Sequence, residues 1–227
     1  MMLVTGGALE PPSERNPNLQ WIFSTSLSEE EMRAIRKPPR KISSGSLRLV
    51  IACRQEREKG VGAAIESLSL LRQEFPGITL DVLGDGKALP EFKRLAKHLG
   101  LDERIRFHGN VHHDEVIRQL QAADLFCYPT SASEGFPKVV LEALACGLPV
   151  ITTQVSVLPH LLRNGCGLVM KEATPKALAQ AVRHCLKDVE GYRRMSLLAT
   201  ETARQYSLER WRDTIGALMQ RMRITEG

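Results

Sequence analysis

Short apolar segments alternate with helical segments along the chain from Leu47 onward. The apolar segments predict six strands, at residues 47–52, 78–83, 104–107, 124–128, 150–152 and 167–170. Helices are expected at residues 62–74, 89–99, 114–122 and 134–147, and beginning near residues 175, 191 and 207. Because apolar strands that alternate with helices build a parallel sheet covered on both faces, the pattern predicts an α/β fold. About six strands suit an open, doubly wound, Rossmann-like sheet better than a barrel of eight.

The composition argues against several classes of protein. The chain is 43% hydrophobic, but no apolar run approaches the roughly 20 residues that a membrane-spanning helix needs. The first residues have neither the basic flank nor the apolar length of a signal peptide. The five cysteines are scattered and have no C-x-x-C spacing, so they indicate neither a disulfide framework nor a zinc site. We therefore expect a cytoplasmic protein.

The chain is basic, with a net charge of +5, and only 5% of its residues are aromatic. It has no basic stripe interleaved with aromatic residues, the pattern typical of nucleic-acid-binding proteins, so no nucleic-acid partner is expected. The densest basic cluster comprises Arg33, Arg36, Lys37, Arg40 and Lys41. We interpret this cluster as part of a solvated linker, with peripheral contact to a membrane surface as the alternative.

Residues 1–44 differ from the rest of the chain and are too short for a hydrophobic core of their own. They contain one expected helix, which Ser26 or Ser28 caps and which carries acidic residues in its first turn, as the helix dipole favours. We predict that residues 1–44 are a leader or linker and that residues 45–227 form the folded domain.

Two carboxylates flank the N-terminus of the helix that residues 134–147 are expected to supply. Glu134 stands in the loop before it, and Glu142 stands eight residues later among apolar residues. An isolated Glu142 is read most simply as reaching water, because a buried carboxylate is costly unless something pairs with it. The free N–H groups of a helix N-terminus bind anions. Phosphate on those groups and hydroxyls on the two carboxylates suit one kind of ligand, a sugar nucleotide.

The stretch from Glu134 to Ile151 resembles the E-x7-E motif of the family 4 glycosyltransferases, retaining enzymes of the GT-B fold. It matches the motif's E-G-F-P start and its E-A-L-A-C-G-L-P-V-I run. The resemblance implies that Glu134 holds the hydroxyls of the transferred sugar and that Glu142 holds the ribose hydroxyls. It also implies that the diphosphate lies against backbone groups of the segment that comprises Gly135, Phe136, Pro137, Lys138 and Val139.

Three further loops follow expected strands. Arg54 and Lys59 resemble the family's G-R-x4-K-G loop, in which two cations hold the diphosphate and stabilise the leaving group's charge. Taken alone, such a mixed-charge loop is more often merely solvated. Gly84 matches a loop where glycine lets the chain approach the nucleotide, with a plain turn as the alternative. Val111 falls in the family's F-x-G-x-V loop, which contacts the nucleobase through backbone groups.

Three histidines, His108, His112 and His113, lie close together after the third expected strand. We do not favour a metal site there, because no H-E-x-x-H pattern is present. Asp114 and Glu115 are better placed to cap the following helix. No cofactor and no metal are expected, since the cations and the helix dipole can carry the charge role that Mg²⁺ has elsewhere.

The resemblance covers about residues 44–222 and only the carboxyl-terminal, donor-binding half of a GT-B enzyme, so residues 1–44 read as a remnant of the amino-terminal domain. The expected function is to bind a UDP-, GDP- or ADP-linked sugar for transfer, with retention, to an acceptor saccharide or lipid. Because the acceptor-binding domain is missing, we expect the chain alone to be inactive and to need an acceptor-domain protein partner. The alternative is a noncatalytic nucleotide-sugar-binding or interaction module. A Rossmann oxidoreductase is disfavoured, because no G-x-G-x-x-G follows the first strand.

Overall fold

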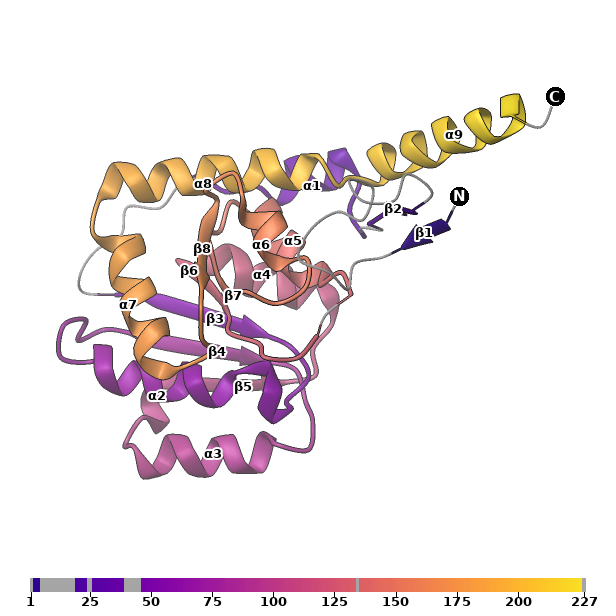
Figure 1. Ribbon diagram of the computed structural model, residues 1–227. Coiled ribbons are helices and arrows are strands. Elements are labelled where there is room, and N and C mark those ends of the chain that lie inside the picture. The colour runs from indigo at the N-terminus through magenta and orange to yellow at the C-terminus, as the bar shows by residue number, and fades with distance from the viewer. Residues whose placement is uncertain (1, 5–18, 24–25, 39–45, 134, 226–227) are drawn as a thin grey trace.

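The computed structural model of the protein describes residues 2–4, 19–23, 26–38, 46–133 and 135–225 (Figure 1). Within these ranges the chain forms one six-stranded sheet with helices on both faces, together with a separate two-stranded sheet near the N-terminus.

The six-stranded sheet is parallel throughout, which confirms the predicted doubly wound fold. Its strands are β3 (Arg48–Ala52), β4 (Thr79–Leu83), β5 (Ile105–Gly109), β6 (Leu125–Tyr128), β7 (Val150–Thr153) and β8 (Gly167–Met170), in the spatial order β5-β4-β3-β6-β7-β8. The strand order therefore reverses between β3 and β6. In open parallel sheets, ligands bind in the crevice beyond the carboxyl ends of the strands at such a reversal.

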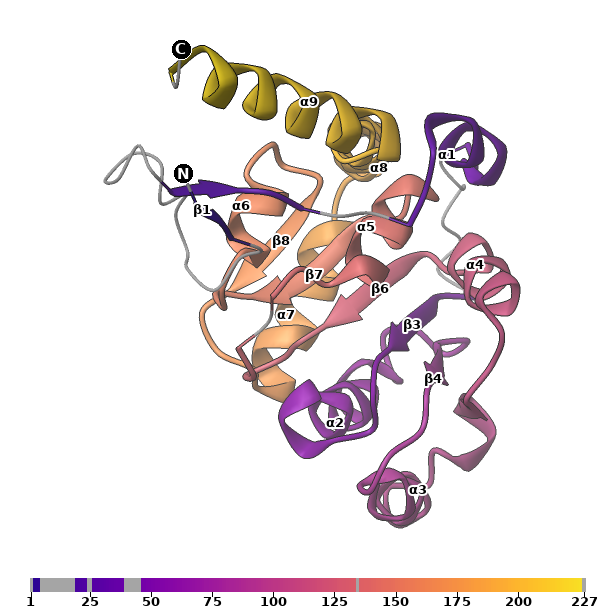
Figure 2. The ribbon, with the colours of Figure 1, turned by 90° about the vertical axis from the view of Figure 1, so that its right-hand side faces the viewer.

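The helices divide between the two faces of the sheet (Figure 2). One face packs on α2 (Val61–Leu71), α3 (Leu89–His98) and α7 (Pro175–Leu186). The other packs on α4 (His113–Ala122), α5 (Lys138–Ala145), α6 (Leu158–Leu162) and most of α8 (Val189–Arg204). Two short 3₁₀ helices, η2 (Arg57–Lys59) and η3 (Asp102–Arg104), lie in loops. The sequence pattern missed α6, which has only five residues and therefore almost no periodicity to detect.

The described part of the N-terminal region packs against this domain. Its helix α1 (Glu29–Ile35) begins at Ser28, which forms a capping box with Glu31. Leu27 and Met32 are buried in the same core cluster as α4 and α5. The predicted boundary between residues 44 and 45 lies in a part of the chain outside the described residues. Arg33, Arg36 and Lys37 of the basic cluster are exposed, whereas Arg40 and Lys41 lie outside the described residues.

The two remaining strands and the last helix lie at one end of the molecule. Strands β1 (Met2–Val4) and β2 (Leu19–Trp21) pair in parallel. Helix α9 (Leu208–Thr225) extends away from the sheet beyond α8 (Figure 1). Met219 on α9 is 55% exposed, while Leu218 beside it is buried. This helix therefore covers the domain with only part of its apolar surface.

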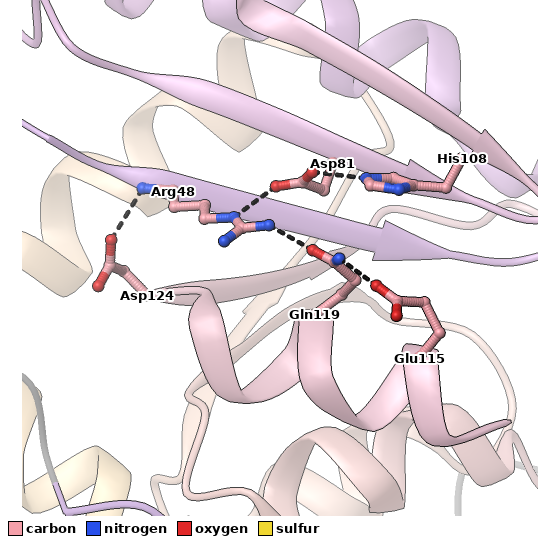
Figure 3. A network of polar contacts seen from close by, with 6 residues as sticks. All are labelled: Arg48, Asp81, His108, Glu115, Gln119 and Asp124. Carbon is pink, nitrogen blue, oxygen red and sulfur yellow. Dashed lines mark hydrogen bonds and ion pairs between the residues drawn. The ribbon is translucent and has the colours of Figure 1, made fainter. Parts of the chain in front are cut away.

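A network of polar side chains crosses β3, β4 and β5 and reaches α4 (Figure 3). At its centre is Asp81 on β4, which is 1% exposed. Its Oδ2 accepts a hydrogen bond from Nε of Arg48 at 2.5 Å, and its Oδ1 lies 2.7 Å from Nε2 of His108. Arg48 also donates to the side chain of Gln119 on α4, and its backbone N–H donates to Asp124 Oδ2 at 2.8 Å. The network therefore joins three strands to the helix that covers them.

The ionised form of Asp81 is the favoured one in this network. Burial by itself would raise the pKa of the carboxyl group, but the hydrogen bonds and positive charge of Arg48 and His108 outweigh burial and lower it. If residue 81 lost its negative charge, the guanidinium of Arg48 would be left without its counter-charge.

We expect Asp81→Asn to lower the free energy of unfolding at neutral pH by about 3 kcal/mol, because it breaks a buried charge pair. The lowered pKa means that the contribution of the carboxylate is present above its ordinary value of 3.8 and is lost as the pH falls through the folded-state value. The stability difference between wild type and variant should therefore begin to shrink as the pH falls below about 4 and should continue to shrink as it passes the folded-state pKa. Urea denaturation at a series of pH values measures it.

Asp102→Asn is the matched control, because Asp102 is an exposed aspartate in η3. It should change the stability by less than about 0.5 kcal/mol at every pH. A difference between wild type and Asp81→Asn that stays constant down to pH 3 would contradict the role assigned to Asp81.

Candidate functional site

A cavity of about 420 Å³ lies beyond the carboxyl ends of β3, β4 and β5, on the side of the sheet that α4 and α5 cover. Its walls come from three strand-end loops and two helices. The lining residues are Ala52, Cys53, Arg54, Leu83, Gly84, Asp85, Asn110, Val111, Val116, Val139 and Glu142. The cavity is thus beside the strand-order reversal, where ligands of such sheets bind.

Five of the predicted site residues meet in this cavity although they are spread over about ninety positions of the sequence. Arg54, Gly84 and Val111 each follow a strand, while Val139 and Glu142 come from α5. Parallel strands end at the same edge of a sheet, so the fold brings these loops together. Their roles toward a ligand stay predictions.

The other predicted residues lie elsewhere or outside the described residues. Glu134 itself belongs to the part of the chain that the structure does not describe. Lys59 is only 7% exposed and is not among the described residues that line the cavity. Phe136 stacks on Phe23 of the N-terminal region, with ring centroids 4.6 Å apart. In the predicted phosphate-binding stretch, Gly135 and Lys138 are exposed. Among the described residues of this stretch, Val139 lines the cavity.

Glu142 is buried, with 6% of its surface exposed, and it is paired. Its Oε1 accepts a hydrogen bond from Ser26 Oγ at 2.9 Å and lies 3.1 Å from Nε2 of His113. The reading of an isolated Glu142 as a side chain that reaches water is therefore incomplete. Its partners stand 116 and 29 positions away in the sequence, so the sequence pattern could not reveal them.

The second oxygen of Glu142 remains open. Within the described residues, Oε2 accepts no hydrogen bond, and it is not one of the buried side-chain atoms that lack a partner, so part of its surface is accessible. Since Glu142 lines the cavity, Oε2 is available to a hydroxyl group of a ligand. A half-satisfied carboxylate at a cavity wall is a typical hydrogen-bond acceptor for a polar ligand.

The N-terminus of α5 is close to where the sequence predicts it. The helix begins at Lys138, four residues after the start of the predicted range 134–147, and Pro137 directly precedes it. The first helical hydrogen bond runs from the N–H of Val140 to the carbonyl of Pro137. The helix ends at Ala145, and Gly147 beyond it has φ +80, as expected for a helix stop.

Gly84 has a structural reason that the sequence did not show. Its φ is +107, and a Cβ added there would lie 2.1 Å from the carbonyl oxygen of Cys53. Gln55, which is fully buried, donates through Nε2 to the carbonyl oxygens of Cys53 and Leu83 at 2.9 and 3.1 Å. The loops after β3 and β4 are thus held in contact, and only glycine fits between them. Gln55 was missed because a glutamine in a charged loop has no distinctive pattern.

The loop that carries Lys59 is fixed against the loop after β6. The backbone N–H of Ser131 donates to the carbonyl of Glu58 at 2.8 Å. Gly60 has φ +81, and a Cβ there would lie 2.1 Å from the carbonyl oxygen of Pro129. These contacts bring the predicted cationic loop next to the segment that leads toward Glu134.

The cysteine and histidine side chains near the cavity do not suggest another chemistry. Burial and the nearby carboxylate of Glu142 raise the pKa of Cys146 to about 12, so its thiol stays protonated. His108 and His113 each pair with a carboxylate of the sheet or of α5. Asp114 and Glu115 lie in the first turn of α4, but the residue that precedes this helix is His112.

Among the described residues, no cluster of three or more His, Cys, Asp or Glu could hold a metal ion. None of the helices in the described part of the chain is long and apolar enough to span a membrane.

The chain is similar in sequence to known proteins over most of its length. The sequence model of the family described as "Glycosyl transferases group 1" matches residues 33–202. "Glycogen synthase" from Mycobacterium tuberculosis (strain ATCC 25618 / H37Rv) is 33% identical over 163 residues, which cover 71% of this chain and 39% of that protein. The chain thus spans about two fifths of the length of this relative.

Solved structures share its fold. The Anabaena protein Alr3699/HepE, crystallised with UDP and glucose, has a TM-score of 0.75 at 21% identity; the match covers 89% of this chain and 57% of that one. The C-terminal domain of the glycosyl transferase group 1 family protein LpcC from Francisella tularensis has a TM-score of 0.63 at 21% identity. That match covers 80% of this chain and 93% of that domain.

Proposed function

Because the chain belongs to the group 1 glycosyl transferases, we propose that it is the donor-binding domain of a retaining GT-B enzyme of family 4. Such an enzyme transfers a sugar from a nucleotide-sugar to an acceptor hydroxyl and keeps the anomeric configuration. The observation that carries the proposal is Glu142, a buried carboxylate with one oxygen held by protein donors and the other open to a cavity at the strand ends. The UDP and glucose in Alr3699/HepE support a nucleotide-sugar as the ligand.

In this proposal Glu142 binds the ribose hydroxyls and Glu134 binds hydroxyls of the transferred sugar. The base lies toward Val111, and the diphosphate lies between Arg54 and the N-terminus of α5. When the bond between the anomeric carbon and the diphosphate breaks, negative charge grows on the leaving group. A guanidinium and free helix N–H groups stabilise that charge without a metal ion.

The two proposed cations are not equally supported. Arg54 lines the cavity, and its side chain is 75% exposed, so it can reach a bound diphosphate. Lys59 is buried in a loop that packs against the segment after β6. Of the two, Arg54 is therefore the stronger candidate for the diphosphate contact, and a role for Lys59 requires that the ligand approach the segment after β6.

We further propose that an acceptor-binding domain is supplied by another polypeptide or by a part of the protein beyond this chain. The chain covers only 39% of the glycogen synthase that it resembles, and it aligns with most of an isolated C-terminal domain. Transfer needs the acceptor hydroxyl to be held against the reacting carbon, and orientation supplies much of the rate. The acceptor would be a saccharide or a lipid, in the second case through peripheral contact with a membrane.

The chain is expected to bind at least one nucleoside diphosphate or its sugar, with an affinity that EDTA does not change. Calorimetry against UDP-, GDP- and ADP-sugars, with and without the chelator, measures this. Arg54→Met should weaken binding, because it removes a charge-assisted contact worth roughly 1.5–3 kcal/mol. The control is Arg57→Met, an exposed arginine of the same loop that pairs with Glu91 at 2.8 Å. Absence of binding, or a requirement for Mg²⁺, would contradict the proposal.

The two carboxylates should respond differently to ligand. Glu142→Gln should weaken the binding of the nucleotide-sugar and of the nucleoside diphosphate alike, since both ligands carry the ribose. The expected loss of binding free energy is roughly 1.5–3 kcal/mol. Glu134→Gln should weaken the binding of the nucleotide-sugar only, because the nucleoside diphosphate lacks the sugar that Glu134 binds. The same calorimetric series with each variant tests this. Equal behaviour of the two variants would show that the roles are assigned wrongly.

Transfer to an acceptor should be undetectable with the purified chain and should appear when an acceptor-binding partner is added. The chain holds the donor but leaves the reacting carbon without a positioned hydroxyl. Product formation from labelled donor is measured with saccharide and lipid acceptors, first with the chain alone and then with cell lysate. Slow hydrolysis of the donor is compatible with the proposal. Robust transfer by the chain alone would refute the need for a second domain.

A further inference from the structure

We propose that His113 is a positioning residue, which holds the carboxylate of Glu142 so that its second oxygen faces the ligand. The inference rests on the proposed function, in which Glu142 binds the ribose hydroxyls, and adds a residue that touches no ligand itself. It is carried by the contact between His113 Nε2 and Glu142 Oε1 at 3.1 Å.

The contact joins two helices that both border the cavity. His113 is the first residue of α4, and Glu142 lies in the middle of α5. Figure 2 shows α4 and α5 next to each other, with α1 beyond them. An ionised carboxylate only accepts hydrogen bonds, so Nε2 of His113 must carry the hydrogen. The imidazole therefore acts as the hydrogen-bond donor to Oε1 of Glu142 and leaves Oε2 for a ligand.

Both protein donors bind the same oxygen. Ser26 Oγ, from the segment before α1, reaches Oε1 at 2.9 Å, and His113 Nε2, from the first residue of α4, lies 3.1 Å from it. Neither uses Oε2, which stays accessible at the cavity wall. A glutamate side chain loses rotamer freedom when it binds a ligand, and a carboxylate already held by two donors has less to lose. Support of this kind around a binding residue is what makes its geometry reproducible.

His113 can be changed with little cost to the fold. Its side chain is 50% exposed, whereas the carboxylate of Glu142 is 8% exposed. The contact thus contributes mainly by orienting Glu142 and by satisfying a charge that burial disfavours. Ser26 lies outside residues 33–202, so half of this support comes from a segment that the family model does not cover.

The test compares ligands with and without ribose hydroxyls. UDP, GDP and ADP and their 2′,3′-dideoxy counterparts are titrated into wild type, His113→Leu, His113→Gln and His112→Leu. Wild type should prefer the hydroxyl-bearing member of at least one pair by about tenfold or more, the effect of one charge-assisted hydrogen bond. In His113→Leu that preference should fall to about threefold or less, mainly through weaker binding of the hydroxyl-bearing ligand.

The other variants separate positioning from general damage. His113→Gln keeps an N–H donor and should retain most of the preference. His112→Leu changes the exposed neighbour, which does not contact Glu142, and should behave as wild type. A purely structural effect would weaken both members of a pair equally and leave their ratio intact. If His113→Leu does not fold by circular dichroism, His113→Ala takes its place.

The outcomes distinguish this inference from the proposed function. If wild type binds none of the pairs, both fall. If it binds without preferring ribose hydroxyls, the role of Glu142 falls, and that of His113 with it. If wild type shows the preference and His113→Leu keeps it in full, the positioning role alone is overturned.

Discussion

A parallel sheet has to be covered on both faces, and the rest of this structure depends on that requirement. The inner strands of the central sheet have no solvent-facing side: Leu49, Val50 and Ile51 of β3 are all completely buried. Covering both faces forces the chain to cross over by a helix after each strand and to return to the same edge. All six strands consequently end at one edge, where the loops after β3, β4 and β5 meet and, with α4 and α5, form the cavity.

Two of the carboxylates that this packing buries are paired with groups on elements distant in sequence. Asp81 bonds to Arg48 and His108 on the neighbouring strands, so the sheet and α4 are joined by charge as well as by apolar contact. Glu142 is held by α4 and by the N-terminal segment. Both carboxylates sit in the same apolar layer. One has both oxygens satisfied by protein and serves the fold, while the other keeps an oxygen open at a cavity, which suits a ligand.

The prediction of the fold succeeded where the sequence carries a long regular signal. Most of the strands are largely apolar runs, and helices such as α3 and α7 have a clear apolar face, so their approximate bounds could be read directly. It failed at α6, which is too short to show a period, and it began the helix at residue 134, whereas α5 begins at Lys138. Leu27 and Met32 of the N-terminal region pack into the core of the domain, because tertiary contacts supply what a short segment cannot supply alone.

By itself the sequence determined the order of strands and helices, the doubly wound class and the residue types at the strand ends, because these depend on local periodicity and on motifs within one loop. Only the tertiary structure decided which of those residues share a cavity, that Lys59 is buried while Arg54 is exposed, and that Gly84 is required by the carbonyl of Cys53. It also decided the partners of Glu142. Hydrogen bonds over 29 and 116 positions leave no trace in spacing, since the fold alone brings those atoms within reach of one another.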